Sequence, residues 1–320
     1  MQTEPGTAPI SVVIPVFNAG QTLEACLNSI LAQTMRPREI IVVDDGSTDE
    51  TAAVAREFSA HVRLLQQPNQ GSAVARQHGT EEARCEHIAY LDGDDWWPDH
   101  TIATYARLFE SADIHFLMAD FVRAEPGTPP ENHLPRNSSF YPWFLDFARE
   151  HGELTPVLGL TRLPADRALE AMLRGFPYFP SASLARRASV LAVGGWDRRF
   201  RRCQDFDLAL RLTRRYPLHY FHKVQAIVGI NDGNRDVKRY VIQQTTACIA
   251  VLHAHYEAAQ SDATYRQQVA TGLARKYYSL GNTYGDARDK SSALRAYRGA
   301  VRWPGLRAKA LARMMLLPLR

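Results

Sequence analysis

Three carboxylates crowd the segment Tyr90–Asp95, where a run of strand-forming residues gives way to a turn. Asp92, Asp94 and Asp95 stand within four residues of one another. Such crowding of like charges is unfavourable unless a cation or hydrogen-bond donors meet them. Because Mg²⁺ binds one or two carboxylates together with phosphate oxygens, the segment suits a metal-bound diphosphate. The alternative is a solvated acidic turn in which one Asp caps the next helix.

The elements that place these acids alternate between two patterns. Apolar, β-branched runs predict strands at Ile10–Phe17, Glu39–Val43, Val62–Leu65, Ile88–Leu91 and Ile114–Val122. Apolar residues at helical spacing predict helices at Thr22–Gln33, from Ser47 or Thr48 through Phe58, at Ala73–Ala83 and at Pro98–Ser111. This alternation predicts βαβ units and a parallel sheet. Ligands of such sheets bind at the carboxyl ends of the strands, where Asp92 emerges.

The middle of the chain gives weaker signals. A Pro-, Asn- and Ser-rich stretch predicts a long loop over Ala124–Pro142. The patterns after it predict helices at Phe140–Glu150, Ala165–Arg174 and Cys203–Leu212, and strands at Ser181–Leu184 and Leu218–Ile230. Asp205 and Asp207 both start the Cys203–Leu212 helix. Since a helix advances about 100° per residue, the two carboxylates diverge by roughly 200°, so only one can face a cleft.

Composition and missing motifs exclude several classes of protein. The charged fraction is 22%, as in ordinary soluble proteins. The four cysteines show neither a C-x-x-C pair nor zinc-type spacing and are predicted to be reduced and buried. Neither G-x-G-x-x-G nor G-x-x-x-x-G-K-[ST] is present, so a nucleotide site would lack a phosphate loop. With a polar N-terminus and no apolar run near 20 residues, the predicted location is the cytoplasm.

The C-terminal third is predicted to be helical and basic. Helices are expected at Arg235–Ala259 and Ala263–Leu280, and the spacing of Tyr277, Leu280, Gly281, Tyr284, Ala293, Tyr297 and Ala300 fits one tetratricopeptide repeat. Residues 263–320 carry twelve Lys and Arg but two Asp, a net +10 against +4 for the whole chain, so the preceding part sums to −6. The segment Arg302–Arg320 is basic, amphipathic and free of acids. It could lie on an anionic membrane surface, or it could be an ordinary terminal helix.

Four segments, in order, resemble the bacterial family-2 glycosyltransferases, inverting enzymes of the GT-A fold that use nucleotide sugars. They read VVIPVFNAGQTLEACLNSILAQT, EIIVVDDGSTDET, NQGSAVARQHG with YLDGDDWW, and GGWDRRF with QDFDLALRL. Together they cover roughly Ile10 to Leu212. The resemblance implies an α/β fold of GT-A type, with a mostly parallel Rossmann-like sheet flanked by helices and followed by an α-helical C-terminal region. The predicted boundaries are a disordered N-terminus at 1–9, a GT-A domain at 10–234 and the helical region at 235–320.

The resemblance also assigns roles to residues. Asp205 would be the catalytic base, and Asp45 would hydrogen-bond the nucleotide base. Asp94 and Asp95 would bind Mg²⁺ or Mn²⁺. The remaining assignments are the donor-binding residues Pro15, Phe17, Arg76, Asp92 and Asp94, and the acceptor-binding residues Gly195, Trp196 and Asp197.

Two departures from the family pattern concern the donor site. Arg76-Gln77 stands where the family has Arg-Asn, which leaves Arg76 as a candidate for donor binding. Residues 227–234, after the last strand, contain no histidine that could join a metal site. His222 lies nearby in sequence, but its predicted partner is a backbone group.

The predicted function is therefore metal-assisted transfer of a sugar, from a UDP-sugar or another nucleotide sugar, to a hydroxyl of a glycan or lipid-linked acceptor. This activity belongs to polysaccharide and cell-envelope biosynthesis. The predicted partners are the donor, the acceptor and, through residues 302–320, the inner face of an anionic membrane. No nucleic acid is expected. A sugar-nucleotide nucleotidyltransferase is an alternative, although Asn18-Ala19-Gly20-Gln21 is neither Gly-rich nor basic. A non-catalytic scaffold using the helical tail is another, and the intact acids argue against it.

Overall fold

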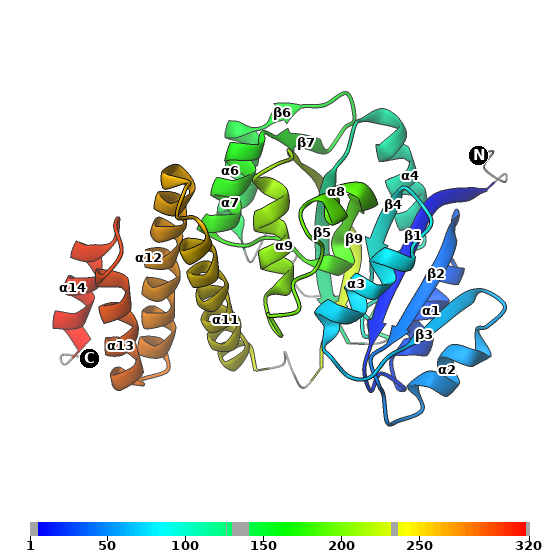
Figure 1. The fold of residues 1–320 in the computed structure, drawn as a ribbon, viewed down its shortest axis with the longest axis horizontal. Helices are drawn as coiled ribbons and strands as arrows, with labels where there is room; N and C mark the ends of the chain where they lie inside the picture. Colours follow the sequence, from blue (N-terminus) through cyan, green and yellow to red (C-terminus); the bar gives the residue numbers. More distant parts are fainter. Residues whose placement is uncertain (1–5, 126, 130–140, 232–235, 318–320) are drawn as a thin grey trace. The chain divides into compact units, whose positions relative to one another are not determined.

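The chain forms two compact units in a computed structural model that describes residues 6–125, 127–129, 141–231 and 236–317. One unit comprises Met1–Ala171 and Pro177–Ile230, and the other comprises Met172–Phe176 and Asn231–Arg320. The first unit is built on a single sheet, and the second is helical (Figure 1).

The sheet has nine strands in the order β3-β2-β1-β4-β8-β5-β9-β7-β6. The strands are β1 Thr7–Val16, β2 Arg36–Asp44, β3 Val62–Gln66, β4 His87–Tyr90, β5 Phe116–Ala124, β6 Glu153–Leu154, β7 Leu160–Leu163, β8 Ser183–Arg186 and β9 Leu218–Gly229. β1 pairs in parallel with β2 and β4, as do β2 with β3 and β5 with β9. β8 lies antiparallel between β4 and β5, and β7 is antiparallel to β6 and β9. The predicted α/β fold with a helix-flanked sheet is confirmed. The sheet is mixed, because β8 and β7 run antiparallel to their neighbours.

The helices of the first unit cover a core centred on β1. They are α1 Leu23–Leu31, α2 Thr51–Glu57, α3 Ser72–Glu82, α4 Thr101–Ser111, α6 Pro142–His151, α7 Ala165–Arg174 (which runs on into the second unit), α8 Arg187–Ala192 and α9 Gln204–Thr213, with a 3-10 turn, η2, at Pro180–Ala182. Ile10, Val12 and Ile14 of β1 are fully buried, as expected for a central strand covered on both faces. Leu23 and Leu27 of α1 join the same core from one helical face.

Several predicted boundaries shift in the structure. β1 begins at Thr7, so residues 7–9 lie in a strand rather than in a disordered N-terminus. β2 begins at Arg36 and includes Pro37, which the strand tolerates because β3 pairs with β2 only from Ile40 onward. Helix α4 begins at Thr101 rather than at Pro98.

Two other expectations concern the middle of the chain. β6 and β7 were not predicted, since their sequences EL and LTRL show no apolar run that indicates a strand. Most of the predicted Ala124–Pro142 loop, residues 126 and 130–140, lies outside the described residues.

The second unit contains α11 Val237–Ala258, α12 Ala263–Asp286, α13 Lys290–Val301 and α14 Arg307–Leu316. α12 and α13 form a hairpin whose close approach depends on two glycines. A Cβ at Gly281 would overlap the Tyr297 ring, and one at Gly299 would overlap the Tyr277 ring. The residues that fitted a tetratricopeptide spacing thus do build a helical hairpin, while the repeat itself stays a prediction. Among the residues described, no helix has the length and apolarity needed to cross a bilayer.

Candidate active site

The acidic turn that follows β4 is tied to two distant segments by Asp95. Its Oδ2 accepts a 2.5 Å hydrogen bond from the Ser181 hydroxyl, and its Oδ1 accepts one of 2.8 Å from the backbone N–H of Gly229. The side chain is 2% exposed. Burial, then the charges of Asp94 and Asp92, hold its pKa well above the usual range. Asp95 therefore acts as a brace for the turn. Each oxygen keeps a further lone pair beside its hydrogen bond, so metal binding by Asp95 stays a prediction.

The end of β9 closes tightly over the same turn. A Cβ at Gly229 would overlap the carbonyl oxygen of Asp94, so only glycine allows this approach. Trp96 and Ile227 exchange backbone hydrogen bonds of 3.1 and 2.8 Å beside it. These contacts fix where Asp92 and Asp94 lie relative to the sheet.

Arg76 of α3 brings the turn together with α9. Its guanidinium forms an ion pair with Asp92, and its Cζ lies 5.0 Å from the ring centroid of Trp196. Arg76 is 4% exposed, and its Nε and Nη1 find no hydrogen-bond partner among the described residues. Because buried guanidinium groups normally satisfy their donors, the N–H groups on these two nitrogens could meet an anionic ligand.

Asp205 lies at the start of α9, within the electrostatic reach of the Arg76–Asp92 pair. Burial raises the pKa of Asp205 to about 6. The positive charge of Arg76 lowers this pKa, and the negative charge of Asp92 raises it. Its Oδ1 accepts a 2.9 Å hydrogen bond from the N–H of Phe206, and the preceding Cys203 has a left-handed backbone, with φ of 56°. A carboxylate with a pKa near neutrality beside a cationic group suits a general base.

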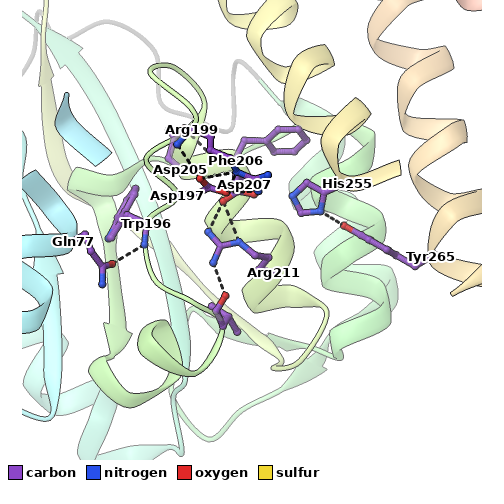
Figure 2. A network of polar contacts seen from close by, with 11 residues as sticks. Gln77, Trp196, Asp197, Arg199, Asp205, Phe206, Asp207, Arg211, His255 and Tyr265 are labelled. Atoms are coloured by element: carbon purple, nitrogen blue, oxygen red, sulfur yellow. Dashed lines mark hydrogen bonds and ion pairs between the residues drawn. The ribbon is translucent and has the colours of Figure 1, made fainter. Parts of the chain in front are cut away.

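Asp207 has a different environment from Asp205 (Figure 2). Asp207 is 2% exposed and pairs with Arg211, whose Nε donates at 3.0 Å and whose Nη1 donates to the Val193 carbonyl at 2.6 Å. Asp205 and Asp207 thus have different partners, and which of them faces a cleft stays a prediction. Asp207 anchors α9 to the end of α8.

Gln77 holds the Gly195–Asp197 segment in place (Figure 2). Its Oε1 accepts a 2.8 Å hydrogen bond from the N–H of Trp196, and a Cβ at Gly195, where φ is 66°, would overlap the Gln77 amide. The Trp196 indole is 3% exposed and meets Tyr90 edge-on at 5.0 Å. The indole packs against the Arg76 guanidinium. Acceptor binding by this segment stays a prediction, and the burial of Trp196 does not favour it.

The carboxylate of Asp197 is hydrogen-bonded to Arg199 on the same loop. Arg199 donates to both of its oxygens, with Nε at 3.1 Å from Oδ1 and 2.9 Å from Oδ2. These hydrogen bonds, opposed by burial, hold the Asp197 pKa below its usual range.

The residues assigned to the nucleotide base line the carboxyl ends of β1 and β2. The N–H of Asp45 donates to the Val16 carbonyl at 2.8 Å, and Pro15 is buried while Phe17 is 50% exposed. The Asp45 carboxylate is buried and accepts hydrogen bonds from Gln67 Nε2, Gln70 N and Gly71 N at 2.8, 2.9 and 2.7 Å. It therefore orders the loop before α3, and its role towards a base stays a prediction.

His222 is held by a side chain rather than by the backbone group that was expected. Its Nε2 lies 2.9 Å from the Thr161 hydroxyl. Sequence reasoning also missed Gln77, Ser181 and Gly229. For Gln77 the signal was present, since it stands at the one position that departs from the family's Arg-Asn pair.

The described residues contain no group of three or more His, Cys, Asp and Glu side chains arranged to hold a metal. A Mg²⁺-type site does not need such a group, because the ion takes one or two carboxylates and the phosphates of a substrate. Burial and the crowding of Asp92 and Asp94 raise the pKa of Asp95, and a bound cation would relieve this crowding. Asp92 faces Arg76, and Asp94 and Asp95 stay the predicted metal ligands.

The mixed sheet, with acids at the carboxyl ends of β2 and β4, defines an α/β fold similar to that of GT-A glycosyltransferases. S. aureus TarS 1–349 in complex with UDP-GlcNAc shares it with a TM-score of 0.61 at 16% identity, over 96% of this chain and 88% of that one. The mannosyltransferase PcManGT from Pyrobaculum calidifontis, in complex with GDP-Man and Mn²⁺, gives 0.61 at 15% identity, over 98% and 81%. Residues 11–162, just under half of the chain, match the family model Glycosyl transferase family 2.

Curated relatives match somewhat more than a third of the chain. The uncharacterized glycosyltransferase YibD of Escherichia coli K12 is 39% identical over 127 residues, 38% of this chain and 37% of that protein. The glycosyltransferase AglE of Haloferax volcanii is 40% identical over 134 residues, 39% of this chain and 43% of that protein. The chain thus covers less than half the length of either relative.

Proposed function

We propose that this chain is an inverting glycosyltransferase that moves a sugar from a nucleotide sugar to a hydroxyl of a glycan or lipid-linked acceptor. The observation that carries the proposal is the grouping of Asp205 and the acidic turn around one buried arginine. Arg76 pairs with Asp92, and the charges of both act on Asp205. The match of residues 11–162 to the family supports the same reaction class.

The proposed chemistry is a single displacement. Asp205 takes the proton of the acceptor hydroxyl as that oxygen attacks the anomeric carbon of the donor. The bond from the anomeric carbon to the nucleoside diphosphate breaks, and the configuration of the carbon inverts. The raised pKa of Asp205 suits a base that must be ionised near neutral pH yet hold a proton briefly. Arg76 orients the donor through the N–H groups of Nε and Nη1.

A divalent cation, Mg²⁺ or Mn²⁺, fits the acidic turn, with Asp94 as its protein ligand and the donor diphosphate supplying further oxygens. When bound, it would neutralise charge that develops on the leaving diphosphate. A UDP-sugar is the proposed donor. Because the structure of PcManGT contains GDP-Man, GDP-sugars belong in the same screen.

The test is a panel of UDP- and GDP-sugars with Mg²⁺ or Mn²⁺, measured by calorimetry for binding and by nucleoside diphosphate release for slow donor hydrolysis. We expect one donor to bind and to be hydrolysed slowly by the wild type. Asp205→Asn should bind it with unchanged affinity. A chain that binds no nucleotide sugar would favour the scaffold alternative, and release of pyrophosphate from a sugar phosphate and a nucleoside triphosphate would favour the nucleotidyltransferase.

A further inference from the structure

The outer face of helix α14 is apolar, and among the described residues its large side chains are exposed. Ala310, Met314 and Leu317 recur at helical spacing and join the cluster of Tyr297 and Ala300. Leu311, Met315 and Leu316 point elsewhere and are 41%, 74% and 47% exposed. The other large apolar side chains exposed among the described residues are scattered singly or in one loop, at Phe17, Leu154, Leu158 and Val237. α14 therefore concentrates an unusual amount of exposed apolar surface in ten residues.

Cations border this face on both sides. Counting about 100° per residue, Arg307 lies on one border, and Lys309 and Arg313 lie on the other. From Lys290 to Leu317 the chain carries seven Lys and Arg and no Asp or Glu. An exposed apolar stripe with flanking cations is the pattern of a helix that lies in a membrane interface, where long basic side chains reach the headgroups.

A cavity of about 730 Å³ opens beside the same helix. Its lining includes the cationic side chains of Arg288, Lys290 and Arg313, the single acid Asp286, and the apolar Leu316 and Leu317. Arg313 also donates to the Tyr278 hydroxyl at 3.4 Å, which holds it at the rim. Three cations against one acid, next to leucines, suit a phosphate attached to an acyl chain rather than a neutral ligand.

We propose that α14 and this cavity form a docking surface for an anionic membrane, in which Leu311, Met315 and Leu316 enter the interface and a lipid phosphate meets Arg288, Lys290 and Arg313. Charge complementarity favours an anionic membrane over an apolar protein surface. A protein partner would need negative charges to match the seven cations of the acid-free stretch 290–317. The proposal concerns the helical unit alone and is independent of the donor chemistry.

The experiment measures co-sedimentation of the full chain with vesicles of phosphatidylcholine alone and of equal parts phosphatidylcholine and phosphatidylglycerol. We expect binding to the anionic vesicles only, and weaker binding at high salt. Arg307→Gln with Lys309→Gln should weaken binding about 30-fold, since each cation near the surface contributes roughly a factor of five. Leu311→Ser with Met315→Ser should weaken it about tenfold or more.

The matched controls change the same residue types elsewhere. Arg56→Gln with Arg149→Gln, and Leu154→Ser with Leu158→Ser, replace exposed residues and should leave vesicle binding unchanged. Circular dichroism and thermal unfolding check that each variant folds, and calorimetry with the donor checks the other unit. Equal binding to both vesicle types, no binding, or binding that ignores both α14 variants would overturn the proposal. If the chain instead forms a dimer, binds no vesicles, and the dimer dissociates only in Leu311→Ser with Met315→Ser, the face would be assigned to a second copy of the chain.

Discussion

At the scale of single residues, Asp205 sets the expected pH dependence. Its pKa is raised to about 6, so the carboxylate is protonated below that pH and cannot accept a proton from the acceptor. The acid limb of kcat/KM should therefore rise through about pH 6 and level off above it. Asp205→Asn should cut transfer by about 10²–10⁴-fold while donor affinity stays near that of the wild type. Transfer assayed at saturating donor across pH 4–8 measures both, and wild-type rates in the variant would refute the assignment.

The Asp205 carboxylate should also make the stability depend on pH, in the direction opposite to that of an acid in an ion pair. Its folded pKa lies above the unfolded value of about 3.9, so the unfolded state binds fewer protons between pH 4 and 6 and stability falls as pH rises through that window. Asp205→Asn removes this penalty. We expect the variant to be more stable by at most about 3 kcal/mol at pH 7 and unchanged near pH 3. Urea unfolding at the two pH values tests this, and Asp207→Asn, which breaks the Arg211 pair, should destabilise instead.

Arg76 links the two acids, and its removal should be visible in the titration of Asp205. Its positive charge lowers the Asp205 pKa, so Arg76→Gln should move the acid limb of the rate profile to higher pH. Arg76→Lys keeps the charge and should move it less. Loss of the pair with Asp92 should also cost up to about 3 kcal/mol of stability, because it leaves a partly buried carboxylate without its partner. A purely structural Arg76 would lower stability without shifting the profile.

Residue-level prediction from sequence succeeded where local geometry alone decides. Helix periodicity separated Asp205 from Asp207 because both lie on one short helix. It could not find Ser181 or Gln77, since their partners, Asp95 and Trp196, lie 86 and 119 residues away in sequence. The structural role of Asp95 depends on such distant contacts, so it could not be predicted from the sequence.

At the scale of elements, the first four strands were predictable because each contains a run of strand-forming apolar residues and is followed by a helix. β8 was harder. It has four residues, and its antiparallel position between β4 and β5 follows from long-range pairing rather than from its own sequence. The N-terminal half of the sheet was therefore foreseen, and its mixed centre was not.

The junction of β9 with the acidic turn gives an element-scale prediction. Gly229→Ala places a Cβ where the Asp94 carbonyl lies, so the turn must move. We expect loss of metal-dependent donor binding and a cost of about 1–3 kcal/mol in stability. Gly285→Ala is the matched control, since a Cβ there meets nothing within 4 Å, and it should stabilise α12 by up to about 1 kcal/mol. Unchanged donor affinity in Gly229→Ala would remove the turn from the donor site.

At the scale of the whole molecule, the two compact units have separate cores. Ile10 and Leu27 belong to a cluster of the first unit, while Tyr297 and Ala300 belong to one of the second. Units with their own cores can unfold in separate steps, and a ligand stabilises only the unit that binds it. Since the candidate site residues all lie in the first unit, the donor should raise only one transition in calorimetry.

The size of that shift and its dependence on metal complete the last prediction. A donor at 100 times its Kd adds about 2.7 kcal/mol, which corresponds to roughly 5–10 °C for a unit of about 200 residues. Because Asp94 is the proposed metal ligand, EDTA or Asp94→Ala should abolish the shift, while the α14 variants should retain it. The second transition should stay fixed in every case. A shift of equal size with and without EDTA would eliminate the cation from donor binding, and a shift of both transitions would show that the helical unit takes part in it.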